Sequence, residues 1–516
     1  MRAIFVPLRP LLFPRPFSAP PIRPRVFAVL FFALASAALA QVSPIPENLG
    51  LGLRQLAEAS RTDPAQLKAR AITAPSINAD VTGRVLVNVQ LNGEVPFGEM
   101  QAKLSDLGAE ITAADNRWRN GVISAWLPLA AAEAAAILPG VRSITLARKP
   151  IRRVGAVTAQ SSVVERSGEV NAPGVVTPQG VIGRGISVGL VSDSYDVAAN
   201  TPRASVGIAS GDLPGPGNPD GYTQPVVVLK EDTSADATDE ARGMAEIVHD
   251  IAPGAKLSVS AAGDTQTSMA ASIRNLRTSP QTLCDVIVDD IGFPDEPFFS
   301  DGLIAQAIDD VSTSNTLPGK KVAYFSAAGN SDNRGYAADA NIISSAASQP
   351  YRGNLRFNNV PSGLFAGGFQ NLNATGTPAI IMTLTTDADP VSLVFQWDDP
   401  FNTGGVTTDY NVLVFNSSGV YLGSISGTDN NFSTSQPLEI ADLSPNTTYQ
   451  VVISLASGGS PTARHLRMVA FGGGGVSGDY WASNVISVYG HPSAANANVF
   501  RLRARTRVNT TTRMTL

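Results

Sequence analysis

The chain has 516 residues, of which 43% are hydrophobic and 16% charged, a composition that supports more than one buried core and excludes an intrinsically disordered chain. Its net charge of −5 hides two basic ends, because residues 1–40 and residues 501–516 each carry five arginines and no acid. Without those ten arginines, residues 41–500 carry a net charge of −15. So negative a charge on residues 41–500 excludes nucleic acid and an anionic membrane surface as partners.

Cysteine and histidine are scarce in this chain. Cys284 is the single cysteine, which excludes an intrachain disulfide and a cysteine-based metal cluster. Three histidines do not favour a histidine-rich metal site. We therefore expect no resident cofactor, with calcium as the one open alternative, taken up below.

The first forty residues have the pattern of a signal peptide. Arg23 and Arg25 precede an apolar run at 26–35, and Ala38-Leu39-Ala40 supplies the small residues of an A-x-A cleavage site. The alternative is a membrane anchor, but the apolar run is shorter than the roughly 18 residues that a spanning helix needs. The sequence therefore predicts an exported protein, secreted or periplasmic, that is not held in a membrane.

Residues 84–150 predict a small domain that follows a polar leader at 41–83. The elements expected from hydrophobic periodicity are strand 84–91, helix 97–107, strands 108–114 and 121–128, helix 129–138 and strand 141–147. The order β-α-β-β-α-β is that of the ferredoxin-like arrangement. Because this fold supports many activities, it does not by itself indicate a function.

From about Gly183 the pattern changes to apolar strands that alternate with helices. The expected strands are 186–192, 226–229, 256–260, 285–289 and 321–327, and the expected helices are 239–250, 267–277 and 302–314. Such strands with crossover helices predict a parallel sheet that is covered on both faces. Binding and active sites on such sheets lie beyond the carboxyl ends of the strands. The polar residues at those ends are Asp193, Asp289, Asp290 and Asn330.

Three segments of this region resemble subtilases. Residues 183–196 (GRGISVGLVSDSYD) resemble the first strand and catalytic Asp, 240–255 (EARGMAEIVHDIAPGA) resemble the helix that begins at the catalytic His, and 324–330 (YFSAAGN) resemble the strand with the oxyanion Asn. The domain at 84–150 is similar to the propeptide of that family. The resemblance implies an α/β fold with a subtilisin-like parallel sheet and flanking helices, preceded by a ferredoxin-like propeptide and interrupted by a β-sandwich insert.

The resemblance also implies roles for individual residues. Asp193 and Glu240 would serve as the acid-base pair, and Asn330 would stabilise the oxyanion. Asp290 and Gly292 occupy the place of a substrate-lining strand. The alternatives are that Asn330 forms a turn after a glycine and that Asp290 caps a strand.

Glu240 stands where subtilases have their catalytic His. Sedolisins, their acid-acting relatives, have Glu there and Asp four residues later, but this chain has Met244 at that position. It therefore resembles a hybrid branch of the subtilase/sedolisin clan. We expect Glu240, Met244, Ile247 and Ile251 to form one sheet-facing stripe, and Glu240 to share a proton with Asp193. The alternative is a Glu that only matches the helix dipole.

The nucleophilic serine of the clan has no counterpart in the expected place. A Gly-Thr-Ser-x-Ala-x-Pro segment should follow Asn330, and the sequence contains none. Thr267-Ser268-Met269-Ala270-Ala271 is similar only superficially and precedes Asn330, so we expect an ordinary helix start there. Residues 480–498 resemble a resumption of the peptidase domain, and 499–516 form a basic tail. We expect a frameshift or truncation to have removed the serine; the alternative is a natural basic tail.

Residues 350–472 predict a β-sandwich inserted after the peptidase-like part at 175–345. The expected strands are 379–385, 391–397, 409–415, 420–424, 436–440 and 448–455. Asp398, Asp399 and Asp409 are candidate calcium ligands, although acidic loop residues of this kind are more often solvated.

These observations predict a secreted serine-type endopeptidase that hydrolyses peptide bonds through an acyl-enzyme and is inactive without its serine segment. Its partners would be a polypeptide substrate and its own propeptide. The alternative is a non-catalytic secreted protein that binds through the sandwich or the degenerate peptide cleft. A phosphatase with Asp193 as nucleophile is excluded because Tyr195 stands where an acid is needed, and His249 is expected to be structural.

Overall fold

The computed structural model describes residues 44–62, 77–80, 82–148, 151–152, 167–172, 180–199, 201–327, 335–373, 375–456, 465–472 and 475–481. The expected signal peptide, Asn330, residues 482–498 of the expected peptidase resumption and the basic tail lie outside the described residues. In the parts of the chain that the structure describes, no helix is both long and apolar enough to cross a bilayer.

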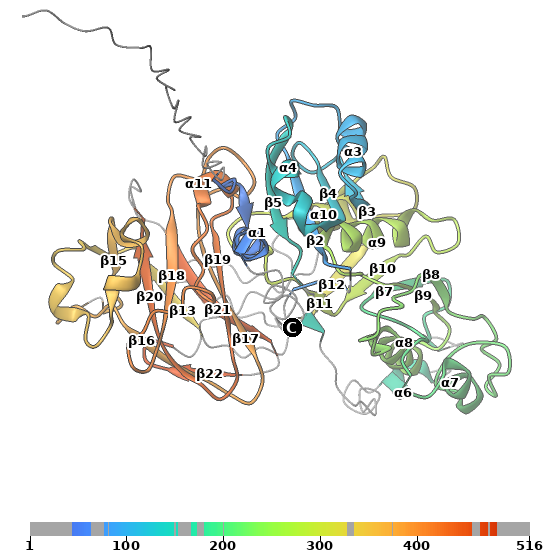
Figure 1. The fold of residues 1–516 in the computed structure, drawn as a ribbon. Helices are drawn as coiled ribbons and strands as arrows, with labels where there is room; N and C mark the ends of the chain where they lie inside the picture. The colour runs from blue at the N-terminus through green and yellow to red at the C-terminus, as the bar shows by residue number, and fades with distance from the viewer. Residues whose placement is uncertain are drawn as a thin grey trace, which may run out of the picture. The chain divides into compact units, whose positions relative to one another are not determined.

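The small domain has the predicted order of elements (Figure 1). It consists of β2 (Arg84–Leu91), α3 (Phe97–Asp106), β3 (Glu110–Asp115), β4 (Val122–Pro128), a 3₁₀ turn and α4 (Leu129–Ala131 and Ala132–Ala136), and β5 (Val141–Leu146). The strands are ordered β5-β2-β4-β3, and every neighbouring pair is antiparallel. Both expected helices start after a proline and pack apolar residues on this sheet. The ferredoxin-like arrangement is therefore confirmed.

The segment expected to be a polar leader contains regular structure. Strand β1 (Leu49–Gly50) adds to the edge of the small sheet, parallel to β5, and helix α1 (Leu53–Thr62) follows. Leu49, Leu53 and Leu56 are buried in the core of the small domain. The prediction for 41–83 was wrong in this part, because short apolar runs between polar residues do not show their burial from composition alone.

The second sheet is parallel throughout, with the order β12-β10-β7-β9-β8. Its strands are β7 (Ser187–Val191), β8 (Val227–Lys230), β9 (Lys256–Ser260), β10 (Val286–Asp289) and β12 (Ala323–Ser326). The helices are α6 (Ser167–Asn171), α7 (Ala204–Ser210), α8 (Glu240–Ile251), α9 (Gln266–Thr278) and α10 (Leu303–Thr313). All five predicted strands and all three predicted helices are present.

Alternate residues of β7 face two separate cores. Val191 packs with apolar residues of α9 and α10, whereas Val188 and Leu190 pack with the alanines of α8. The sheet is therefore covered on both faces, as its continuous apolar strands predict.

One guanidinium connects three elements of the fold. Arg274 of α9 is buried and forms ion pairs with Asp115 at the end of β3 and, at 2.7 Å, with Asp310 of α10. Nearby, the Ser124 hydroxyl donates to that of Thr267 at 2.9 Å. The small domain therefore contributes polar and ionic partners to α9 rather than only covering it.

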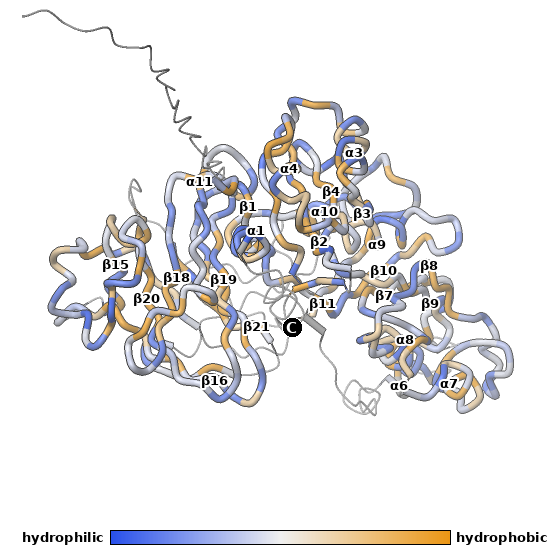
Figure 2. Tube along the Cα trace, viewed as in Figure 1, coloured by the Kyte–Doolittle hydropathy of each residue, from blue (hydrophilic) through white to orange (hydrophobic). Residues whose placement is uncertain are grey.

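The described strands after residue 335 form two antiparallel sheets packed into a sandwich. One sheet contains β13 (Tyr336–Asp339), β21 (His465–Gly472), β17 (Val391–Trp397) and β19 (Leu438–Leu443). The other contains β14 (Ile342–Ile343), β15 (Gly368–Gln370), β20 (Thr448–Leu455), β16 (Met382–Thr386), β22 (Val476–Gly478) and β18 (Tyr410–Asn416). Hydrophilic turns separate the hydrophobic stretches of these strands (Figure 2).

Two details of the sandwich differ from the sequence prediction. Residues 420–424 form no strand: beyond the isolated bridge between Phe415 and Tyr421, a further turn, closed by a bond from the Ile425 N–H to the Leu422 carbonyl at 3.1 Å, ends the pairing with β18. The sandwich also begins before residue 350, since β13 and β14 pair with its strands. Among the described residues of the sandwich, helical structure is limited to α11 (Asn431–Thr434) and the 3₁₀ turns Gln349–Tyr351, Phe357–Asn359 and Ser362–Phe365.

Candidate active site

The strand order identifies where a ligand would meet the parallel sheet. From the central strand β7 the chain first builds β8 and β9 on one side and then β10 and β12 on the other. The carboxyl ends of β7 and β10 therefore flank the point at which the topology reverses, the usual location of a binding crevice. Asp193 follows β7 and Asp289 ends β10, so both residues lie at this edge.

Asp193 fixes the start of α8 against β7. Its side chain is 1% exposed and accepts hydrogen bonds from the backbone N–H groups of Ser194 (2.5 Å), Thr238 (2.6 Å) and Glu240 (2.9 Å). The Thr238 hydroxyl donates a fourth bond at 2.6 Å. Asp193 thus satisfies backbone donors at the amino end of α8, which are otherwise left without acceptors.

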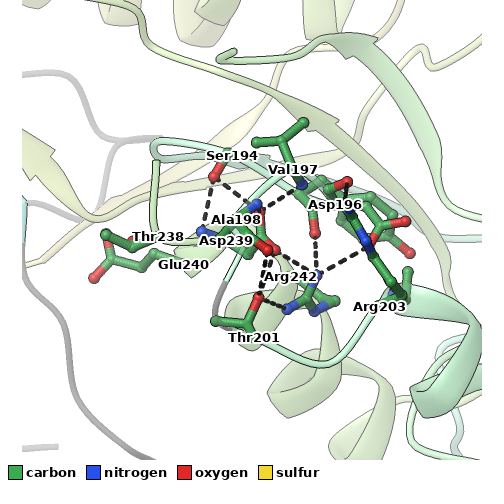
Figure 3. Close-up of polar contacts among 12 residues, drawn as sticks. Ser194, Asp196, Val197, Ala198, Thr201, Arg203, Thr238, Asp239, Glu240 and Arg242 are labelled. Carbon is green, nitrogen blue, oxygen red and sulfur yellow. Dashed lines mark hydrogen bonds and ion pairs between the residues drawn. The ribbon is translucent and has the colours of Figure 1, made fainter. Parts of the chain in front are cut away.

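Glu240 is the first residue of α8 and lies next to Asp193. Its Oε2 accepts a hydrogen bond from the Ser192 hydroxyl at 2.6 Å, and its position in the first turn suits a negative charge. Figure 3 shows its side chain directed away from the ion-paired cluster around Arg242. The expectation that Asp193 and Glu240 share one proton stays a prediction.

The sheet-facing stripe of α8 is not the expected one. Its buried residues are Ala241, Arg242, Ala245 and His249, whereas Glu240, Met244, Ile247 and Ile251 are partly exposed. The small alanine side chains allow the helix backbone to approach the sheet closely, and the larger side chains then lie along the border of the contact. Glu240 is therefore at the border of the core and is partly exposed.

Asp239 is the main residue of this region that sequence reasoning missed. It has a left-handed backbone (φ 61°) and accepts hydrogen bonds from the N–H groups of Val197 (2.9 Å) and Ala198 (3.0 Å). Its other oxygen bonds the Thr201 hydroxyl at 2.8 Å and the Arg242 guanidinium at 2.7 Å (Figure 3). Burial acts to raise the pKa of Asp239, but these donors outweigh it and lower the pKa to about 2.

This cluster orders the loop that follows Asp193. Besides Asp239, the Arg242 guanidinium binds the carbonyl of Tyr195 (2.8 Å) and the carboxylate of Asp196 (3.2 Å). An acid before a helix with an arginine three residues later was the available sequence signal. The cluster is structural support for the crevice edge rather than part of it.

His249 is structural, as expected. It is buried near the end of α8, its ring meets Tyr222 edge-on at 5.2 Å, and burial lowers its pKa. A neutral, packed imidazole on this side of the helix is directed away from the Glu240 end.

The segment predicted to line the substrate is paired with a strand from an earlier part of the chain. Residues of β11 (Ile291–Gly292) pair antiparallel with β6 (Ile151–Arg152), which follows the small domain by a few residues. Gly292 lies opposite Ile151, and Asp290 next to it is partly buried. The Asp289 carboxylate accepts bonds from Tyr324 (2.5 Å) and Ser326 (2.7 Å), so it joins β10 to β12.

The candidate calcium ligands are not assembled into a cation site. Asp399 accepts hydrogen bonds from Trp397 Nε1 (3.2 Å) and from the N–H groups of Thr407 (3.0 Å) and Thr408 (2.9 Å), which shape its loop. Across the described parts of the chain, no group of three His, Cys, Asp or Glu residues is arranged to hold a metal. Asp409 belongs instead to a cluster of buried acids inside the sandwich.

Comparison with known proteins identifies one part of the chain. No curated protein matches it. Residues 378–467, which include β16 to β20 and the start of β21, match the fibronectin type III domain.

Proposed function

We propose that this protein binds extended polypeptides along β11, in a crevice of the subtilase/sedolisin type. The observation that carries the proposal is the antiparallel pairing of β6 with β11 at the reversal point of the parallel sheet. Backbone pairing of this kind is how an edge strand accepts an extended chain regardless of its sequence. The positions of Asp193 and Glu240 beside that edge support the same clan.

In this proposal β6 occupies the place of an external peptide. It lies in the same chain, so it competes at a high effective concentration, in the millimolar range for a short connection. The protein would be exported, as its first forty residues predict, and the fibronectin type III domain would be a further binding module.

Loss of β6 pairing should expose the peptide-binding edge. Proline lacks a backbone N–H, so Ile151→Pro should release β6 and raise the affinity for a fluorescent peptide copying residues 147–156 by at least about 10-fold. Fluorescence anisotropy measures this affinity. Adding Gly292→Pro should remove the binding again, because it disables the acceptor strand.

A fold control comes from the single thiol. Cys284 is buried, and burial raises its pKa to about 12, so it should react with a thiol reagent only after unfolding. Unchanged peptide affinity in an Ile151→Pro protein with a protected thiol would contradict the proposal.

Endopeptidase activity is a second candidate, favoured by the presence of Asp193 and Glu240 together at the start of α8, where Asp193 accepts from the Glu240 N–H. Because the sequence has no Gly-Thr-Ser-x-Ala-x-Pro segment, we propose binding first and hydrolysis second. Denatured casein incubated from pH 3 to pH 8 tests it: cleavage that Glu240→Gln abolishes supports this role, and intact casein at every pH rejects it.

A further inference from the structure

A lysine and a serine meet outside the pair of carboxylates described above. Lys230 is the last residue of β8, and Ser268 lies in the first turn of α9. The Nζ of Lys230 is within hydrogen-bonding distance of Ser268 Oγ and lies 3.4 Å from the Ala262 carbonyl oxygen. Ser268 Oγ itself donates to that carbonyl at 2.6 Å. Both side chains are partly exposed, so a solvent-borne reagent can reach them.

Lys230 is placed where its ammonium loses a proton more readily than usual. Burial lowers its pKa, and the more distant charges of Asp232 and Asp264 reverse this only in part. A neutral lysine can accept a proton, which is why lysines with lowered pKa serve as general bases. With the proton gone, Nζ becomes an acceptor for the Ser268 hydroxyl, to which it is already adjacent.

The backbone leaves room in front of these two atoms. Gly263 has φ +71°, and a Cβ at that position would lie 2.5 Å from Ser268 Oγ and 2.6 Å from Lys230 Nζ. Any other residue would therefore press against both reactive atoms and be strained in its backbone. Glycine here lets Lys230 Nζ and Ser268 Oγ lie close against the loop backbone.

The start of α9 supplies the electrostatics that an acyl-transfer site needs. Thr265 caps the helix by accepting from the Ser268 N–H at 3.1 Å, and the N–H groups of the residues before Ser268 lack intrahelical acceptors. They and the helix dipole favour negative charge beside Ser268 Oγ.

We propose that Ser268 is a nucleophile and Lys230 its general base, in a site for acyl transfer from ester or amide substrates. Nζ takes the hydroxyl proton while Oγ bonds to the substrate carbonyl carbon, and the π electrons of the C=O bond move to oxygen. When the carbonyl re-forms, the bond to the leaving oxygen or nitrogen breaks and that atom takes the proton from Nζ. Lys230 Nζ then takes a proton from water as the water oxygen bonds to the acyl carbon; the bond from that carbon to Oγ breaks, Oγ takes the proton from Nζ, and the carboxylic acid leaves. Serine–lysine pairs are one of the known forms of this chemistry.

The site is separate from the carboxylates but connected to them by one loop. The Ala262 N–H donates to the Ser192 carbonyl at 2.8 Å, and the Ser192 hydroxyl binds Glu240. The acylation needs neither Asp193 nor Glu240, so it can succeed or fail independently of peptide binding at β11.

Labelling with a fluorophosphonate probe tests the proposal on the full chain. Ser268 Oγ should displace fluoride from phosphorus, and mass spectrometry should place the adduct on the peptide that contains Ser268. The labelling rate should rise with pH as Lys230 deprotonates. Ser268→Ala should abolish labelling, while Ser272→Ala on the same helix, whose hydroxyl is buried on the Ala261 carbonyl, should leave it unchanged.

Lys230→Arg distinguishes a base from a structural cation. Arginine keeps the charge and donates hydrogen bonds but stays protonated, so labelling should fall at least about 100-fold while Cys284 remains protected. No labelling of the folded wild-type protein at any pH, an adduct on another residue, or full labelling of Lys230→Arg would each overturn the proposal.

Discussion

Replacing Asp239 by alanine should lower the free energy of unfolding by about 3–5 kcal/mol, the largest effect expected for a single substitution in the α/β part. The change leaves the buried guanidinium of Arg242 without its closest carboxylate and removes the acceptor for the Val197 and Ala198 amides. It also places alanine in a left-handed backbone, which costs it more than aspartate. Urea unfolding followed by circular dichroism measures the difference.

Two further variants separate the causes. Glu246→Ala removes a longer, 3.9 Å ion pair of the same guanidinium, whose carboxylate side chain is 39% exposed, and should cost less than about 1 kcal/mol. Asp239→Asn tolerates the left-handed backbone but loses the charge, so its stability should lie between wild type and alanine. An Asp239→Ala protein as stable as Glu246→Ala would show that the cluster does not stabilise the loop.

The sandwich should be less stable at pH 8 than at pH 5. Burial raises the pKa of Asp429 to about 6 and of Asp409 to about 7, and that of Glu439 well above its ordinary value. Because the folded state holds these protons up to a higher pH than the unfolded chain does, the contribution of these acids to stability is complete below about pH 4 and is lost as the pH rises through 6 to 7. Calorimetry should show a melting temperature at least about 5 °C lower at pH 8.

The hydrogen bonds and charges around these three buried acids bear on the shifts of their pKa values. Glu439 accepts from the Asp429 N–H at 3.1 Å and from the Asn431 amide at 2.9 Å, and the Asp429 carboxylate accepts from the Leu51 N–H. The negative charges of Glu47 and Asp429 help to raise the pKa of Asp409. The positive charges of Arg54 and Arg148 act in the opposite direction on the pKa of Asp429.

Charge removal within the cluster gives the matched comparison. Glu439→Gln should raise the melting temperature at pH 8 and flatten its pH dependence, since it removes an acid whose ionisation is disfavoured by burial and by Asp429 and Asp409. Asp479→Asn, an exposed acid of the same sandwich, should leave the profile unchanged. Equal melting temperatures of the wild type at pH 5 and pH 8 would rule out the cluster as the cause.

Hydrophobic periodicity predicted every strand of the two α/β sheets except β1. Strands such as β2 and β17 have the predicted bounds, because their side-chain pattern is a local property. Strand β21 was not predicted, and 420–424 was predicted but is not a strand. There the outcome depends on turn geometry and on partners far away in sequence.

In the candidate site, too, local sequence patterns predicted some residues, whereas contacts between distant residues could not be predicted. Asp193 and Glu240 could be recognised from motifs that sit at the ends of predicted elements. The β6–β11 pairing and the Lys230–Ser268 contact join residues 38 or more positions apart, and no local pattern signals them. Ser268 was expected to be an ordinary helix start, which describes its backbone correctly but not its side chain.

The shared guanidinium of Arg274 bears on how the molecule unfolds. Because one buried cation needs a carboxylate from β3 and another from α10, separating the small domain leaves that charge half compensated inside the α/β core. The two layers should therefore open as a single cooperative unit rather than as independent foldons. A fragment that starts at residue 175 would lack Asp115, and the buried guanidinium of Arg274 would then miss one of its two carboxylate partners.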